Sequence, residues 1–295
     1  MASSAVVASR LIGRDAETER LDAALDRVRE RGGSLVIRGE PGIGKSALLE
    51  HVRERASSLG ARSLTTTGVE SEAELAFAGL HQLLRPITRR MDLLSDVQRD
   101  ALEGAFGLRT TLESDAYRVA LAAYDLVCEA AGGGPLVLIL DDAQWLDRSS
   151  LAVLTFIARR LESESAVLVA AVRNGYATAL DDAGLPTLQL ERLGDAAAAE
   201  LLDREAPDLS PHTRAYVLAE AAGNPLGLPE LARAASKSGD ANETVGPAPV
   251  TLTARLERAF ASRLDELSAE TRVALLAGAL DSEASPRSTG PTERC

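Results

Sequence analysis

Hydrophobic and polar positions alternate in two different ways along the chain, and the pattern changes near residue 193. Before this point, short apolar runs alternate with segments in which apolar residues recur every three or four positions. The runs predict five strands, at 35–37, 62–69, 136–140, 166–172 and 187–190. Because helical segments separate these strands, we expect right-handed crossovers and a parallel sheet.

The intervening helical segments include 15–31, which we expect Asp15 to cap, and an amphipathic segment that starts near Leu112. Beyond residue 193 the helical spacing is continuous. It predicts helices at 195–206, 211–222, 226–236 and 252–267. The pattern therefore indicates an α/β region followed by an all-helical region.

A glycine-rich turn follows the first predicted strand and leads directly into a helix. It contains G-x-x-x-x-G-K-S, and Gly42 and Gly44 allow the backbone to bend so that successive N–H groups point inward. The helix N-terminus adds its positive dipole end to the same place. A simple strand-to-helix turn has no need of the Lys-Ser pair, so the stretch predicts a phosphate-binding loop.

Each residue of this loop is a candidate for nucleotide binding. Lys45 is expected to reach the β- and γ-phosphates, and the Ser46 hydroxyl is expected to hold Mg²⁺. The predicted nucleotide-binding residues are Gly39, Glu40, Pro41, Gly42, Ile43, Gly44, Lys45, Ser46 and Ala47.

Two carboxylates end the buried-type run at 136–140. Ligands of an open parallel sheet bind at the carboxyl ends of its strands, so Asp141 is the predicted Mg²⁺ ligand, directly or through water. Asp142 stands where many related ATPases carry a glutamate that orients the attacking water. Aspartate is one methylene shorter, so hydrolysis is expected to be slow. A lone acidic turn is the alternative interpretation, and the phosphate loop weighs against it.

Arg173 follows the strand predicted at 166–172. A cation at this strand end can sense the γ-phosphate, although a surface arginine before a turn fits the spacing equally well. Lys45, Asp142 and Arg173 are thus the catalytic candidates. Asp147 precedes a helical segment and is expected to cap it.

Composition limits the classes of partner. The formal charge is −12 over 295 residues, which argues against a broad contact with a nucleic-acid backbone. The two cysteines are far apart, a usage that suits the cytoplasm. No run reaches the length of a membrane span, and the three histidines lack metal-ligand spacing.

Five stretches in this order resemble the ATPase module of the STAND class of signalling ATPases, and most closely the large ATP-binding LuxR-type transcriptional regulators of bacteria. They are Leu11-Ile-Gly-Arg-Asp-Ala-Glu17, the phosphate loop, Phe77-Ala-Gly-Leu-His-Gln-Leu-Leu84, Leu138-Ile-Leu-Asp-Asp-Ala-Gln-Trp-Leu-Asp147 and Gly223-Asn-Pro-Leu226.

The resemblance implies a P-loop NTPase sheet, with the strand order of the additional-strand NTPases, sandwiched by helices and followed by a helical lid. It places Arg14 near the adenine and ribose, Asn224 and Pro225 against the nucleotide, and Arg173 on the γ-phosphate. In that family ADP holds a closed form, whereas ATP with an inducer opens it and the opened form self-associates. The inducer for this chain is unknown.

The residue pattern, together with the resemblance, sets the expected domain boundaries. No DNA reader and no membrane segment is visible, and the chain is expected to be either a C-terminally truncated regulator or a stand-alone fragment. The expected parts are a flexible N-terminus (1–9), a P-loop NTPase domain (10–192), a helical lid (193–236), a linker (237–250), the helical start of a truncated further domain (251–281) and a disordered tail (282–295).

The sequence therefore predicts an ATP-binding signalling switch with weak Mg²⁺-dependent ATPase activity. Two alternatives remain open. One is a small-molecule phosphotransferase on the same scaffold, although no arginine-rich lid run stands out. The other is an initiator-type AAA+ ATPase that associates with DNA. A GTPase is disfavoured because no guanine-reading Asn/Thr-Lys-x-Asp sequence occurs.

Overall fold

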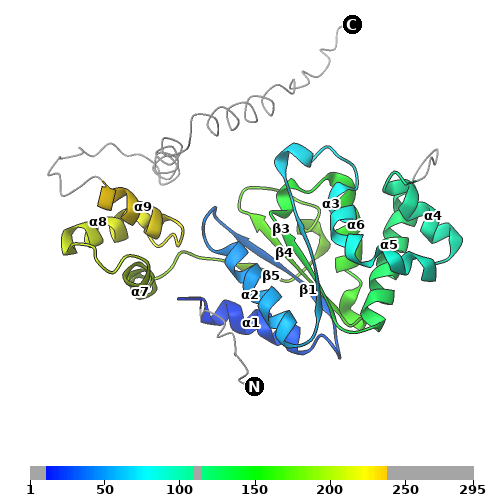
Figure 1. Cartoon of the computed structure of the whole chain (residues 1–295), viewed down its shortest axis with the longest axis horizontal. Helices are drawn as coiled ribbons and strands as arrows, with labels where there is room; N and C mark the ends of the chain where they lie inside the picture. Colours follow the sequence, from blue (N-terminus) through cyan, green and yellow to red (C-terminus); the bar gives the residue numbers. More distant parts are fainter. Residues whose placement is uncertain (1–10, 109–114, 238–295) are drawn as a thin grey trace, which may run out of the picture. The chain divides into compact units, whose positions relative to one another are not determined.

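A computed structural model describes residues 11–108 and 115–237 (Figure 1). Within them, the strands form one five-stranded sheet in the order β2-β3-β4-β1-β5, and all neighbours are parallel. The strands are β1 (Gly33–Gly39), β2 (Arg62–Thr67), β3 (Leu136–Asp141), β4 (Ala166–Arg173) and β5 (Thr187–Gln189). The expected parallel sheet and its strand order are confirmed, and β4 lies between the strand before the phosphate loop and the strand that ends in Asp141.

Helices cover both faces of the sheet. Figure 1 shows α1 and α2 on one side and α3, α5 and α6 on the other. The helices before residue 160 are α1 (Asp15–Asp26), α2 (Lys45–Ser58), α3 (Ala78–Leu84), α4 (Asp96–Ala105), α5 (Ala116–Gly132) and α6 (Arg148–Ala158). The 3₁₀ segments are η1 (Glu70–Glu72), η2 (Arg85–Leu93), η3 (Ala143–Trp145), η4 (Leu161–Ser163) and η5 (Asp181–Ala183).

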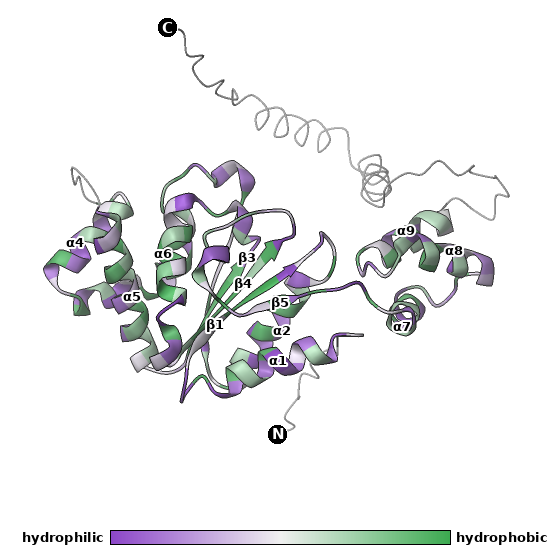
Figure 2. Ribbon diagram, turned by 180° about the vertical axis from the view of Figure 1, so that it is seen from behind, coloured by the Kyte–Doolittle hydropathy of each residue, from purple (hydrophilic) through white to green (hydrophobic). Residues whose placement is uncertain are grey.

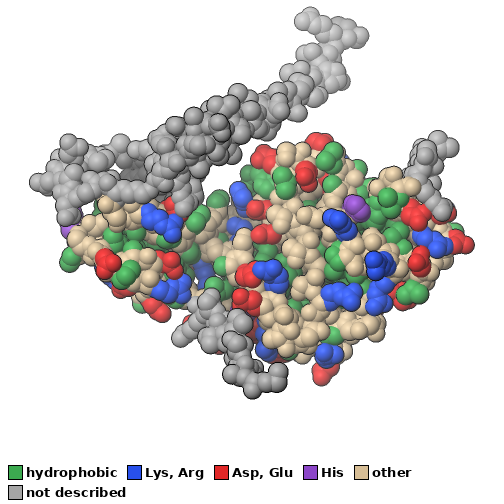
Figure 3. Space-filling model, viewed as in Figure 1, with side chains coloured by type: hydrophobic (Ala, Val, Ile, Leu, Met, Phe, Trp, Pro, Cys, Tyr) green, Lys and Arg blue, Asp and Glu red, His purple; other side chains and the backbone are tan. Residues whose placement is uncertain are grey.

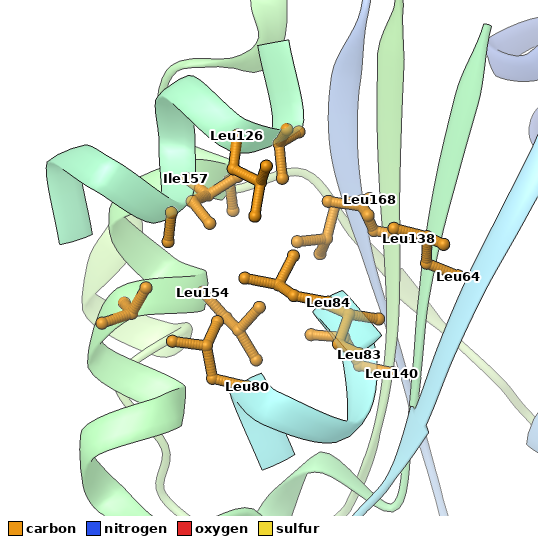
Figure 4. Close-up of a cluster of buried hydrophobic side chains, with 14 of the residues drawn as sticks. Leu64, Leu80, Leu83, Leu84, Leu126, Leu138, Leu140, Leu154, Ile157 and Leu168 are labelled. Atoms are coloured by element: carbon orange, nitrogen blue, oxygen red, sulfur yellow. The ribbon is translucent and has the colours of Figure 1, made fainter. Parts of the chain in front are cut away.

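The inner strand β3 is buried on both faces and contributes to two cores. Leu138 and Leu140 face α3, α5 and α6 in one cluster, whereas Val137 and Ile139 belong to a second cluster with α1 and α2. Figure 4 shows the first cluster, in which leucines of α3 and α6 meet those of the strands. In Figure 2 the strands are largely green, the colour of hydrophobic residues. Such a strand has no polar face, which explains its uninterrupted apolar run.

Three local expectations were wrong. Arg14, rather than Asp15, is the N-cap of α1. The helix ends at Asp26, and the next N–H groups form short-range turns: Val28 donates to Leu25 O and Glu30 donates to Arg27 O. The second strand ends at Thr67 rather than at Val69. The helix expected near Leu112 begins at Ala116, because the Asp115 side chain accepts the N–H of Tyr117 and fixes the start.

The described chain divides into two compact units, one with residues 11–201 and 223–226, the other with 202–222 and 227–237. The helices predicted at 195–206, 211–222 and 226–236 are present as α7 (Asp195–Glu205), α8 (Pro211–Ala221) and α9 (Gly227–Lys237), whereas the one predicted at 252–267 lies outside the described residues. Within the second unit α8 packs on α9, and Arg214 pairs with Asp203.

Several expectations fall elsewhere in the chain. The N-terminus 1–9, the linker beyond Lys237, the helical segment 251–281 and the tail 282–295 lie outside the described residues. Within the described part, no helix has both the length and the apolar character needed to cross a membrane.

Candidate functional site

The phosphate loop connects β1 to α2 through a backbone that only glycine adopts easily. Gly42 and Gly44 have φ angles of 73° and 105°, in the left-handed region. Gly44 is the N-cap of α2 and makes no side-chain cap hydrogen bond. The first turn of α2, which contains Ser46 and Ala47, therefore starts without a capping side chain. The loop thus offers an anion the positive end of the helix dipole.

Lys45 folds back over this loop. Its Nζ donates to the carbonyl oxygens of Gly39 (3.0 Å) and Glu40 (2.9 Å), and the side chain is buried. Burial lowers the pKa of Lys45, as does the positive charge of Arg173, whereas Asp142 and Asp141 oppose the shift. These influences show that the structure brings the four predicted charged residues into one neighbourhood. A poorly solvated ammonium group is well placed to exchange carbonyl oxygens for phosphate oxygens.

Parallel register places the other charged residues at the same edge of the sheet. Gly39 at the end of β1 pairs with Arg173 at the end of β4, and Asp141 ends the adjoining β3. Asp142 follows in a left-handed conformation with a φ of 43°, and its N–H donates to Asp141 Oδ1 (2.8 Å). A non-glycine residue in this region costs about 1–3 kcal/mol and is often found at functional sites.

A ring of hydrogen bonds joins Asp142, Gln144 and Arg173. Arg173 Nε donates to Asp142 Oδ1 (3.1 Å), and a guanidinium NH₂ group donates to Oδ2 (3.3 Å). Gln144 Nε2 donates to Asp142 Oδ1 (2.8 Å), while Gln144 Oε1 accepts the backbone N–H of Arg173 (3.0 Å). Partial burial alone would raise the pKa of Asp142. The bonds from Arg173 and Gln144, with the charges of Arg173 and Lys45, outweigh it and lower that pKa.

Arg14 lies against the back of the phosphate loop. It is buried, and its guanidinium donates to the carbonyl oxygens of Ile43 (2.9 Å) and Glu191 (2.8 Å) and pairs with Glu17 (2.8 Å). Arg14 thus links the start of the described chain to the loop and to the segment after β5.

The turn at 223–226 is also tied to the phosphate loop. Asn224 Nδ2 donates to Pro41 O (3.0 Å), and the Leu226 N–H donates to Gly42 O (3.2 Å). A Cβ on Gly42 would lie 2.8 Å from Leu226 Cβ, so the close approach requires glycine. We call residues 223–226 the strap. Asn224 therefore lies at the loop, with its amide bonded to loop backbone.

A model of the AAA ATPase domain family matches residues 10–170. The chain belongs to this family. Membership implies nucleotide binding at the phosphate loop, and the geometry above fits it: a left-handed glycine loop, an uncapped helix start and a desolvated lysine.

Similarities to individual proteins are more distant. The uncharacterized protein R02095 of Rhizobium meliloti (strain 1021) is 29% identical over 206 residues, which cover 60% of this chain and 20% of that protein. The chain thus spans about a fifth of the length of that curated relative. One chain of the HORMA:CdnC:Trip13 complex of E. coli MS115-1 has a TM-score of 0.51 at 16% identity, covering 88% of this chain and 90% of that one. Cdc6p of Pyrobaculum aerophilum has a TM-score of 0.51 at 18% identity, covering 80% and 65%. These structures share the fold.

The donors of this AAA ATPase domain also suit a hard divalent cation. No group of three or more His, Cys, Asp or Glu side chains forms a metal site within residues 11–108 and 115–237. Mg²⁺ commonly uses one or two protein oxygens together with phosphate and water. Ser46 and Asp141 are the residues that would hold it.

Sequence reasoning missed two members of the site. Gln144 stands in the Asp-Asp-Ala-Gln-Trp stretch, but no role was assigned to it. Arg192 pairs with Glu40 of the phosphate loop (2.9 Å), and nothing in its local sequence marks it. Asp147 proves to be a cap: it accepts the N–H of Ser150 (2.8 Å) and also those of Phe77 and Gly79.

Proposed function

We propose that this AAA ATPase domain is a STAND-class signalling switch, the nucleotide-binding module of a LuxR-type transcriptional regulator. It binds ATP with Mg²⁺ and hydrolyses it slowly, in the cytoplasm. The order of the five sequence stretches supports the class. The single observation that carries the switch is the strap, which bonds the backbone of the phosphate loop and continues directly into α9 at Gly227.

We interpret the side-chain contacts around Asp142 as those of a resting state. Both carboxylate oxygens accept hydrogen bonds from the Arg173 guanidinium, and Oδ1 also accepts one from Gln144. A carboxylate engaged in this way has little capacity left to orient a water molecule or take its proton. A γ-phosphate offers Arg173 a stronger negative partner, so Arg173 would leave Asp142 only when ATP is bound.

The chemistry that follows is phosphoryl transfer to water. Lys45 and the start of α2 stabilise the charge on the phosphates, and Asp142 orients the attacking water once Arg173 has moved. Mg²⁺, held at Ser46 and Asp141, would supply further neutralisation of phosphate charge. Slow turnover follows from two features of Asp142, its short side chain and its competing ion pair.

The strap is the route by which the nucleotide state reaches the helical region. A ligand shifts a conformational equilibrium only through contacts that differ between the two states. Any change in the carbonyl directions of Pro41 or Gly42 alters the bonds to Asn224 and Leu226. We infer that ADP favours the strapped form and that ATP weakens it. Self-association and response to an inducer belong to the same proposal.

A second candidate is an initiator-type ATPase that acts with DNA. The shared fold with Cdc6p favours it. The net charge of −12 weighs against it, and acidic and basic side chains are interspersed on the face that Figure 3 shows. Gel shifts with duplex DNA at low and moderate salt separate the two. Salt-dependent retardation would favour the initiator. No specific observation supports a small-molecule phosphotransferase. That function would require ATP turnover to depend on a hydroxyl acceptor.

The experiment that tests the switch identifies the nucleotide that co-purifies with the chain and then measures its mass in solution with ADP and with ATP. We expect bound ADP, and a larger mass with ATP. A chain that binds both nucleotides and keeps one mass and one hydrogen-exchange pattern with both would contradict the switch while leaving nucleotide binding intact.

A further inference from the structure

A cavity lies at the opposite edge of the sheet from the phosphate loop, where the parallel strands begin. Its volume is about 440 Å³, within the range of pockets that hold small molecules. It is lined by the end of α1 and the turn after it, by the first residues of β1, by the end of α6, and by residues 183–186, which precede β5. All of these belong to the first compact unit.

Backbone contacts fix the walls of this cavity. The Val36 N–H donates to Pro186 O (2.9 Å), and Ser34 Oγ donates to Ala158 O (2.8 Å), so β1 is bonded to both flanking walls. A Cβ on Gly32 would lie 2.2 Å from Ala166 O, which shows how closely the turn packs. Leu35 and Val167 are buried and form an apolar part of the lining. The cavity is therefore preformed rather than dependent on a ligand for its shape.

The charged side chains that line the cavity are unbalanced. Four are arginines and one is an acid: Arg20, Arg27, Arg31, Arg159 and Glu162. Glu162 is already paired with Arg31. Neither Arg20 nor Arg159 has a side-chain hydrogen bond or ion pair within the part of the chain that the structure describes. In a chain with a net charge of −12, such a concentration of unpaired positive charge points to an anionic ligand.

We propose that this cavity binds a small organic anion that carries two or more carboxylate or phosphate groups on a compact body. Guanidinium groups recognise both oxyanions through forked hydrogen bonds, and several arginines that line one cavity favour a ligand with multiple charges. The apolar lining accommodates the carbon body. Because β1 starts in this cavity and ends at Gly39, such a ligand touches the strand that carries the phosphate loop, which makes it a candidate regulator. The proposal does not depend on the switch.

The test uses the full chain carrying Lys45→Ala, so that the phosphate loop does not compete for the probes. Citrate and inorganic pyrophosphate are titrated by calorimetry at low salt. We expect saturable binding of one probe molecule per chain, weakened at least about tenfold by the pair Arg20→Gln and Arg159→Gln, since each removes a charged hydrogen-bond donor. A matched pair on η2, the exposed Arg85→Gln and Arg89→Gln, changes the net charge equally and should leave binding unchanged.

Hydrogen exchange locates the probe independently of affinity. Bound citrate should slow exchange most in residues 31–36 and 183–187, and less in 39–47. Three results would overturn the proposal: no saturable binding, equal weakening by the two arginine pairs, or protection confined to the phosphate loop. Both arginine pairs are exposed, so melting temperatures close to that of the parent chain are expected and serve as the check on folding.

Discussion

The two halves of the nucleotide site are held together in different ways. On the phosphate-loop side, the geometry comes from contiguous residues: left-handed Gly42 and Gly44, and Lys45 bonded to carbonyl oxygens five and six residues earlier. On the opposite side, Asp142, Gln144 and Arg173 come from two strand ends and are joined mainly through side chains. We call these the loop half and the sensor half.

This difference separates binding from switching. Backbone geometry is costly to change, so the glycine conformations of the loop half are in place before a nucleotide arrives, and the proposed switch changes only the carbonyl directions of Pro41 and Gly42. Side-chain bonds exchange partners at little cost when a competing charge appears, so the sensor half can report which nucleotide is present. We therefore expect changes in the loop half to act on affinity, and changes in the sensor half to act on turnover and on the distinction between ATP and ADP.

The largest effect is expected from Lys45→Ala in the loop half. It removes a desolvated charge from the phosphates, a loss of about 2–5 kcal/mol or roughly 30- to 5,000-fold in ATP affinity. Calorimetry measures it. Arg53→Ala, on the exposed face of the same helix, is the matched control and should bind normally. Unchanged affinity in Lys45→Ala would contradict the phosphate-loop assignment.

Asp142→Asn in the sensor half should reduce turnover by about 100-fold, the scale of losing one acid–base group, while ATP affinity stays near that of the parent chain. Asp141→Asn is its neighbouring control. It should weaken binding more in the presence of Mg²⁺ than in its absence, because it removes a metal ligand. If the two variants exchanged these effects, the roles within the pair would be reversed.

The same division explains what the sequence predicted. The phosphate loop and the strand ending in Asp141 were predictable because each depends on residues adjacent in sequence. Asp142, Arg173 and Arg14 were named from position or resemblance, but their partners were not. The Gln144 side chain bonds both the Asp142 carboxylate and the Arg173 backbone. It can do so only because β3 and β4 are paired in this register, which brings their ends together. Arg192 meets Glu40 across 152 residues, a distance that no local pattern encodes.

Gln144→Ala tests the same division between binding and turnover, and its expected effect on turnover is smaller. Gln144 keeps its bond to the Arg173 backbone when the Arg173 side chain moves, so it positions Asp142 for water. Its loss should lower turnover about tenfold without changing ATP affinity. Gln189→Ala, an exposed glutamine on β5, is the control. Equal turnover in both variants would remove Gln144 from the sensor half.

The pH profile of turnover distinguishes positioning from a general structural loss. The bonds from Arg173 and Gln144 lower the pKa of Asp142, and the Gln144 bond remains when Arg173 moves, so activity should fall only as pH drops to or below the ordinary range of a carboxyl group. Gln144→Ala removes one of these bonds and should move the acid limb of turnover to higher pH. The stability that the pairing contributes follows the same sign: it is present above the ordinary carboxyl pKa and is lost as pH falls through the lowered one.

The central claim is that the sensor half reads the γ-phosphate and that the strap passes the result to the helices that follow. The most direct measurement is amide hydrogen exchange of residues 195–235 with saturating ADP or ATP, in the parent chain and in Arg173→Ala. The account predicts lower protection with ATP than with ADP in the parent chain, and no difference in Arg173→Ala, which should still bind ADP. Equal protection with both nucleotides in the parent chain, or an undiminished difference in Arg173→Ala, would contradict it.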